Sequence, residues 1–333
     1  MIARLRFVLI MFMKVTKPQP EGFYQLSTTQ ITMQRYSNFI ALIILAFFIS
    51  VPSFAQIDRL DAEFMLDDLR RLSHDAAQGR KTGTPGNEAA RRFIVGQMKD
   101  VRAKSINKGY EHPFTFKNRA GEEINGVNVI GYVKGEEETA FVITAHYDHV
   151  GVRDSLIYNG ADDNASGVSA LLGMLEYFKS NKPRHTLIFA ALDGEEMGLQ
   201  GAKAFLEDEN IPLENIVLNI NMDMISINDK NELYVAGTHH YPNLKPIIEK
   251  IDPQPLNLKL GHDSPDLGSD DWTGQSDHGA FHKKGIPFFY FGVEDHEHYH
   301  KPTDTFENIN QEFFVMAAHA VLDCILALDI SLN

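Results

Sequence analysis

The sequence has 333 residues and a formal net charge of −14, from 45 acidic and 31 basic residues. So acidic a chain binds nucleic acid or an anionic membrane surface poorly, and we expect neither as a partner. Its single cysteine, Cys324, lies in an apolar helical stretch where we expect it to be a core residue. Without an internal disulfide, the packing of a sizeable core has to hold the fold together.

Residues 1–55 are interpreted as targeting sequence. Residues 33–55 have a basic start, an apolar centre and small residues at the end, which is typical of a cleaved secretory signal peptide. Residues 1–32 are interpreted as a misassigned extension, with translation starting at Met33. An uncleaved anchor helix is the alternative. We expect an exported protein, periplasmic or extracellular, without a stable membrane anchor, that folds as one domain over 56–333.

Helices alternate with strands along the first half of this domain. Apolar residues at helical spacing predict helices at 60–74 and 88–103, with a turn-rich loop between them. Strand patterns follow at 110–132, with a turn at 119–122, and at 141–144. The strand at 141–144 runs into the motif "AHYDHVG", so His146 stands at its end. Asp163 lies in the glycine-rich loop 160–167, which leads into an apolar helix at 168–178.

The apolar run 186–192 is the centre of the predicted sheet. It reads as a strand buried on both faces, and Asp193 and Gly194 end it. The adjacent acids Glu195 and Glu196 follow at its carboxyl end, where ligands of open α/β sheets bind. Adjacent side chains on extended backbone point in different directions, so one of them can hold a metal while the other faces a water molecule or a substrate.

The second half repeats the alternation and defines the fold class. The predicted elements are a helix at 199–206, strands at 216–220, 232–236 and 288–291, and helices at 242–251 and 313–328, with an irregular stretch at 252–273. Asp223 follows the strand at 216–220. This order predicts an α/β three-layer sandwich, with a mixed, mostly parallel central sheet flanked by helices.

Five of the candidate side chains have the composition of a catalytic zinc site. They are imidazoles and carboxylates without thiolates, namely His146, Asp163, Glu196, Asp223 and His300. Five ligands exceed the three that one catalytic zinc needs. A shared carboxylate resolves the surplus: Asp163 bridges two zinc ions, His146 and Asp223 bind one, and Glu196 and His300 bind the other. Glu195 is then free to act as general base.

The ordered motifs resemble the secreted co-catalytic zinc aminopeptidases, metallopeptidase family twenty-eight of the zinc-exopeptidase clan. The resemblance rests on "GRKTGTPGN", "AHYDHVG", "GADDNASG", "DGEEMGLQGA", "NMDMIS", "SDHGAFHKKGIP" and "YHKPTDT". It implies two zinc ions with the ligand roles given above, peptide substrates with a free amino terminus, and a cis peptide bond between Asp163 and Asn164. It leaves the oligomeric state open.

Two more acids and four histidines lie near these candidates. Asp148 is expected to accept a hydrogen bond from the ring of His146 and so to fix its tautomer. Asp277 is placed near the metal ligands, with a helix N-cap in "QSDHG" as the alternative. Four histidines near the ligands in sequence are not counted as ligands: His149, His278, His296 and His298.

Two other functions are compatible with parts of the pattern. Glutaminyl cyclases have the same fold with a single zinc, but animal-type cyclases have extra residues after the acid pair and a tryptophan before the last histidine ligand. Here "EEMGLQGA" is uninterrupted and Tyr299 precedes His300. A non-catalytic binding module of this fold would have lost ligands or the base, and all six residues are present. We therefore predict an aminopeptidase.

Overall fold

The computed structural model describes residues 59–106 and 109–332. By its contacts the chain divides into two units, and the described residues belong to the second, Ile57–Asn333. The predicted extension and signal peptide, residues 1–55, lie outside the described residues.

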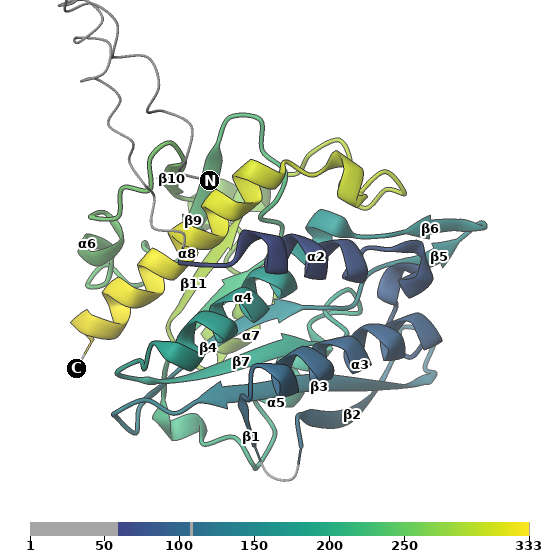
Figure 1. The fold of residues 1–333 in the computed structure, drawn as a ribbon, viewed down its shortest axis with the longest axis horizontal. Helices are drawn as coiled ribbons and strands as arrows, with labels where there is room; N and C mark the ends of the chain where they lie inside the picture. Colours follow the sequence, from purple (N-terminus) through teal and green to yellow (C-terminus); the bar gives the residue numbers. More distant parts are fainter. Residues whose placement is uncertain (1–58, 107–108, 333) are drawn as a thin grey trace, which may run out of the picture. The chain divides into compact units, whose positions relative to one another are not determined.

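A nine-stranded sheet forms the middle of the described chain, in the order β1-β3-β7-β4-β8-β11-β9-β10 with β2 beside β3 (Figure 1). Its strands are β1 (Lys104–Ser105), β2 (Glu111–Lys117), β3 (Glu123–Val133), β4 (Ala140–His146), β7 (Thr186–Leu192), β8 (Ile216–Met222), β9 (Glu232–Ala236), β10 (Asn257–Leu260) and β11 (Phe288–Gly292). A separate hairpin joins β5 (Gly151–Arg153) to β6 (Leu156–Tyr158).

The four central strands run parallel to one another. β4 pairs in parallel with β7 and with β8, and β8 pairs in parallel with β11. Every residue of β4 and β7 is buried, as expected for apolar strands covered on both faces. β3 and β9 flank this parallel core and run antiparallel to its outer strands, β7 and β11 respectively. The carboxyl ends of all four central strands therefore meet at one edge of the sheet.

Helices cover both faces of the sheet, which confirms the predicted three-layer sandwich (Figure 1). α2 (Ala62–Leu72), α3 (Pro85–Asp100), α4 (Gly167–Ser180) and α8 (Gln311–Ser331) pack on the face that includes Phe141 and Ile143. α5 (Gln200–Phe205) and α7 (His278–Lys283) pack on the opposite face with Val142 and Ile188. α6 (Lys245–Ile248) lies against α8. Short turns of other helix types occur at Asp75–Arg80, Ala161–Ser166, Leu213–Asn215, Pro265–Asp270 and Phe306–Asn308.

Polar side chains fix where α2, α3 and α8 begin. Asp61 accepts a hydrogen bond from the Phe64 amide at the start of α2, and Asn310 does the same for Phe313 at the start of α8. Thr84 caps α3, whose first residue is a proline. These residues satisfy backbone amides that have no partner inside the helix, and proline lacks such an amide, so the sequence specifies each start locally.

The prediction was wrong in detail between 242 and 273. The helix predicted at 242–251 spans only Lys245–Ile248, with Pro246 in its first turn. Proline fits a first turn but cannot lie deep inside a helix, so the helix cannot begin much earlier. The stretch predicted as irregular contains β10, a strand that pairs in parallel with β9 and is half exposed. Neighbouring backbone, rather than an apolar pattern, defines such an edge strand.

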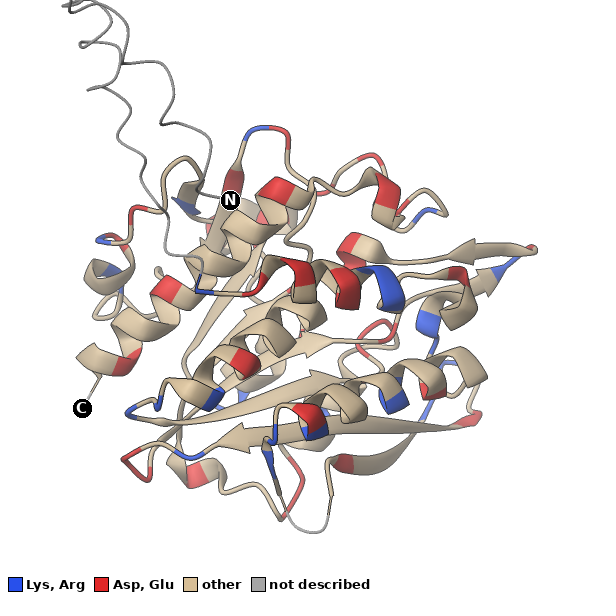
Figure 2. Cartoon of the chain, in the orientation of Figure 1, with Lys and Arg blue, Asp and Glu red and all other residues tan. Residues whose placement is uncertain are grey.

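Charged residues are absent from the two central strands. β4 and β7 contain no Asp, Glu, Lys or Arg, whereas the helices and loops around them carry acidic and basic residues interspersed (Figure 2). Cys324 is buried in α8, as predicted. In the described part of the chain, α8 is the one helix long and apolar enough to cross a membrane, but 72% of its most apolar window is buried inside the molecule. That burial is typical of a core helix.

Candidate metal centre

The edge at which the parallel strands end brings together all five predicted ligands. His146 is the last residue of β4, where it lies level with Leu192 of β7. Glu196 follows β7 in the next loop, Asp223 follows β8 directly, and His300 lies in the segment after β11. Parallel strands point their carboxyl ends the same way, so residues far apart in sequence become neighbours here.

The fifth ligand, Asp163, lies in the turn Ala161–Ser166 before α4. Two contacts tie this turn to the edge of the sheet. The carboxylate of Asp304 accepts hydrogen bonds from the amides of Asp162 and Asp163, at 2.8 and 3.1 Å, and the Asn164 amide group donates to the Met222 carbonyl at 2.9 Å. The peptide bond between Asp163 and Asn164 is cis, as the resemblance implied. The Asp163 side chain is thereby held between the other ligands.

The first cluster of ligand atoms, the three-residue group, consists of His146, Asp163 and Asp223. The Nε2 atom of His146 lies 3.3 Å from Oδ1 of Asp163 and 3.1 Å from Oδ1 of Asp223. All three residues are buried. This is the number of protein ligands found in catalytic zinc sites, which keep a fourth position open.

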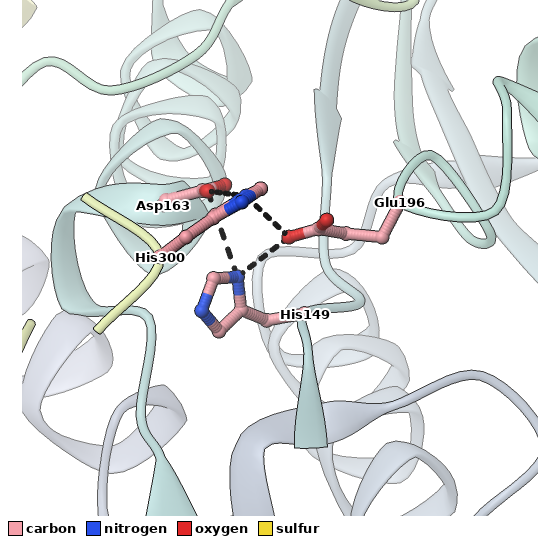
Figure 3. A group of neighbouring side chains, drawn as sticks. All are labelled: His149, Asp163, Glu196 and His300. Carbon is pink, nitrogen blue, oxygen red and sulfur yellow. Dashed lines mark ion pairs between the residues drawn. The ribbon is translucent and has the colours of Figure 1, made fainter. Parts of the chain in front are cut away.

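The second cluster, the four-residue group, consists of His149, Asp163, Glu196 and His300 (Figure 3). Nε2 of His300 lies 3.0 Å from Oδ2 of Asp163 and 3.2 Å from Oε1 of Glu196. Nδ1 of His149 lies 2.8 Å from the same Glu196 oxygen. Asp163 thus turns one oxygen toward each group, which is the arrangement of a carboxylate that bridges two cations.

The electrostatics of the four-residue group favour a bound cation. Burial lowers the pKa of His300, but the carboxylates of Asp163 and Glu196 raise it to about 10. Burial also raises the pKa of Glu196 and Asp163 adds to that, but the rings of His149 and His300 bring it down to about 2. The carboxylates therefore hold positive charge between them. A divalent cation supplies that charge while leaving the imidazoles neutral, so the donor set fits zinc.

Glu195 belongs to neither group and lies beside the three-residue group. Its amide donates to Oδ1 of Asp148 at 3.0 Å, and the Glu196 amide approaches Oδ2 at 3.3 Å, so one carboxylate orients both acids. Desolvation raises the pKa of Glu195 well above its usual range, His146 opposes this, and the negative charge of Asp223 adds to it. A carboxyl group in such surroundings holds a proton readily, as a general base has to.

Asp148 and Asp277 are both buried near the ligands. Nδ1 of His146 lies 3.1 Å from the main-chain oxygen of Asp148 and 3.7 Å from its carboxylate, so the main chain is the nearer acceptor. Asp277 occupies the N-cap position of α7 but makes no capping hydrogen bond. Its two carboxylate oxygens have no hydrogen-bond partner among the described residues, and burial raises its pKa to about 8.

The four histidines that the sequence did not count as ligands separate into two kinds. His149 lies in the four-residue group. The other three have partners outside both groups: His278 contacts the Trp272 carbonyl at 2.8 Å, His296 pairs with Asp162 at 2.9 Å, and His298 contacts Thr303 at 3.0 Å. For His149, the sequence signal was its position three residues after His146, just beyond a strand.

Sequence reasoning also missed the role of the loop "GRKTGTPGN". Arg80 in this loop is fully buried, and its guanidinium donates to the carbonyls of Leu72, Tyr147, Asn159 and Gly160 at 2.6 to 2.8 Å. Two of these carbonyls lie next to the loops that carry the ligands. Arg80 therefore connects α2 to the loops that carry the metal ligands. The sequence signal for this role was a basic residue within a turn rich in glycine and proline.

Known proteins match this chain over its sheet and its site. The model of Peptidase family M28 matches residues 128–325. The aminopeptidase YwaD of Bacillus subtilis is 30% identical over 220 residues, which cover 62% of this chain and 44% of that protein. The alkaline phosphatase isozyme conversion protein of Escherichia coli is 28% identical over 168 residues, covering 46% and 48%. The chain spans less than half the length of these relatives.

Solved structures share the fold at lower identity. The zinc aminopeptidase of Bacillus subtilis superposes with a TM-score of 0.64 at 18% identity, covering 80% of this chain and 94% of that one. The glutaminyl cyclase of Porphyromonas gingivalis superposes with a TM-score of 0.65 at 17% identity, covering 80% and 98%. The family model spans β7, β8 and β11 and reaches all six residues of the two groups, and on that match the chain belongs to Peptidase family M28.

Proposed function

We propose that this chain is a zinc-dependent aminopeptidase that hydrolyses N-terminal peptide bonds, with two zinc ions and Glu195 as general base. The observation that supports two ions is the placement of Asp163, whose Oδ1 lies 3.3 Å from His146 and whose Oδ2 lies 3.0 Å from His300. Each oxygen faces a different group, so each of two ions could take one oxygen of Asp163. The name of the relative YwaD supports the aminopeptidase activity.

Bound zinc would supply Lewis acidity, which polarises the scissile carbonyl and lowers the pKa of water. His146, Asp163 and Asp223 would hold one ion, and His149, Asp163, Glu196 and His300 surround the place of the other. Asp148 orients the base, because its carboxylate accepts the hydrogen bonds from the main chain of Glu195 and Glu196.

Glu195 moves the proton in this reaction. Its carboxylate takes a proton from water as the water oxygen bonds to the scissile carbonyl carbon. The same carboxyl group then gives that proton to the amide nitrogen as the carbon–nitrogen bond breaks, which releases the N-terminal amino acid and leaves Glu195 ionised again. The raised pKa of Glu195 suits the second step, because a carboxyl group of ordinary pKa would be a poor proton donor near neutrality. The positive charge of bound zinc would favour the ionised form that the first step needs.

The test combines zinc content per chain with a panel of peptides that have free or acetylated amino termini. Two zinc ions and cleavage of the free peptides alone support the proposal. One zinc ion, no cleavage and release of ammonia from peptides that begin with glutamine would make the chain a glutaminyl cyclase. The same fold occurs among glutaminyl cyclases, so this arm is needed. Absence of zinc and of both activities would leave a binding module.

We also propose that the protein is exported, because residues 33–55 have the pattern of a signal peptide. Amino-terminal sequencing of the protein secreted by an expressing cell tests this. The expected mature chain starts at Gln56, and a chain that retains residues 33–55 would contradict the proposal.

A further inference from the structure

The two groups of ligand atoms differ in number, and His149 makes the difference. Without His149 each group would have one histidine, one separate carboxylate and the shared Asp163. His149 lies in the loop after β4, and its side chain is fully buried. The five ligands that the sequence predicts are therefore not the complete set of side chains around the two places where cations fit.

The ring of His149 has a neighbour but no hydrogen bond. Nδ1 lies 2.8 Å from Oε1 of Glu196, within hydrogen-bond distance, yet neither atom has a hydrogen-bond partner among residues 59–106 and 109–332. The direction of the ring nitrogen misses the oxygen. Both atoms carry lone pairs, and both are buried side by side without a hydrogen bond between them. This is the arrangement of two ligand atoms that bind the same cation. Buried polar groups normally have a partner, so this pair calls for one.

The distances within the four-residue group match a zinc tetrahedron. Bonds of about 2.0–2.1 Å from zinc to nitrogen or oxygen place neighbouring tetrahedral ligands roughly 3.3 Å apart. The four ion-pair distances in the group are 2.8, 3.0, 3.2 and 3.6 Å (Figure 3). All four ligand atoms lie within 4.8 Å of one another. One cation can therefore reach all four side chains.

The backbone fixes the ring of His149 in this orientation. Gly160, with φ of +59°, passes so close that an added Cβ atom would lie 2.6 Å from two ring carbons of His149. The rings of His149 and His300 also meet edge to face, with centroids 5.7 Å apart. By contrast, the nearby His296 has an ordinary hydrogen bond to Asp162. His149 is thus held close to Asp163 and Glu196, although its ring nitrogens have no hydrogen bond to any of the described residues.

We propose that His149 is the fourth protein ligand of the four-residue group, which then binds one zinc ion in a closed tetrahedral site. The three-residue group keeps the open coordination position, where water and substrate bind. This inference rests on the two-zinc centre proposed above. It gives the two zinc ions different numbers of protein ligands. Closed four-ligand sites are typical of structural zinc, whereas catalytic sites have three protein ligands. The ion of the four-residue group should therefore bind more tightly.

The first experiment uses the wild-type protein. After removal of metal, one equivalent of zinc is added and the coordination shell is measured by X-ray absorption. Two imidazole nitrogens at about 2.0–2.1 Å are expected, since the tight site contains His149 and His300. A single imidazole would overturn the inference, because the three-residue group and a four-residue group without His149 each have only one.

The second experiment titrates zinc against a competing chelator in His149→Asn and His149→Ala. Asn keeps a polar side chain of similar reach but is a poor zinc ligand. Wild type should show one tight and one weaker zinc ion, and both variants should weaken the tight one by at least about tenfold. His298→Ala is the matched control, because His298 lies in the same loop as His300 but bonds Thr303. It should match wild type.

The outcomes separate this inference from the proposed function. Two zinc ions in wild type and unchanged affinities in both His149 variants would show that His149 is no ligand, while the two-zinc centre would stand. Fewer than two zinc ions in wild type would contradict the proposed centre itself. If a variant fails to fold by circular dichroism, the absorption measurement on wild type still decides the question.

Discussion

Glu195 is the residue on which the proposed chemistry depends most. Replacing it with Gln removes the proton acceptor but keeps the size of the side chain and the main-chain contacts to Asp148. We expect Glu195→Gln to retain both zinc ions and to lose at least about a hundredfold in kcat, the usual contribution of general base catalysis. Near-normal turnover with full metal content would show that another group moves the proton.

Asp163 and Asp223 are both buried carboxylates, but their replacement should affect different numbers of zinc ions. Asp163 contacts both groups, whereas Asp223 contacts only the three-residue group. Asp163→Ala is therefore expected to lower the affinity for both ions, and Asp223→Ala to lower it for one. Zinc content after dialysis measures both variants side by side. An Asp163 variant that keeps two ions would contradict the bridging role.

Most of the candidate site could be predicted from the sequence, because its residues stand at the ends of apolar strands. His146, Glu196 and Asp223 each follow a run that can only be a buried strand, and parallel strands bring their ends together. The position of His149 just after a strand singles it out as a candidate but does not decide its role, since the direction of a side chain in a loop depends on contacts such as the one with Gly160. Motif spacing carries no information about such contacts.

At the scale of elements, Arg80 joins α2 to the loops that hold the ligands. Arg80→Met would remove the Arg80 donor from three buried carbonyls, those of Leu72, Tyr147 and Asn159, whereas the Gly160 carbonyl would keep the Ala165 amide. Each buried carbonyl left unpaired costs about 1–3 kcal/mol, so we expect a loss of at least about 3 kcal/mol in the free energy of unfolding. Urea denaturation measures this loss. Arg92→Met is the control, because Arg92 is exposed and among the described residues forms its ion pair with Glu88; it should change stability by less than about 0.5 kcal/mol.

The contact between α2 and α3 should make stability depend on pH. Burial raises the pKa of Asp68 to about 7 from its ordinary value of 3.8, against the opposing hydrogen bond from Gln97. Below pH 3.8, Asp68 is protonated in both the folded and the unfolded chain. Between about pH 4 and 7 the unfolded chain ionises first, so the free energy of unfolding falls as pH rises and stays lowered above pH 7.

Asp68→Asn isolates this effect, because it keeps the shape of the side chain and cannot ionise. At pH 8 the variant should be more stable than wild type by on the order of 2 kcal/mol, and near pH 4 the difference should vanish. Urea denaturation at the two pH values measures it. An equal difference at both values would mean that packing, rather than ionisation, separates the two proteins.

The elements themselves were predictable to different degrees. The strand at 186–192 and the strand at 232–236 coincide with β7 and β9 residue by residue, because apolar β-branched and aromatic runs fit a covered sheet. β10 was missed, since its residues alternate between exposed and half-buried positions and its pairing partner β9 decides its conformation. Apolar periodicity therefore identifies covered elements better than edges.

At the scale of the whole molecule, metal binding should stabilise the fold, because the ligands come from loops spread between residues 146 and 300. Zinc at a hundred times its dissociation constant adds about 2.7 kcal/mol per site. In a protein of this size that raises Tm by about 5 °C or more. Thermal unfolding after chelation and after zinc is restored measures the difference. Equal Tm values would contradict zinc binding to the folded chain.

The strand order has a consequence for how the centre is assembled as the polypeptide is made. β11, whose following segment carries His300, lies in the sheet between β8 and β9, so the last ligand comes from a strand inserted beside earlier ones. A nascent chain has all three ligands of one group once Asp223 has emerged, but lacks the other group until His300 has followed. The four-residue group, which we propose to be the tighter site, is therefore the later one to be completed.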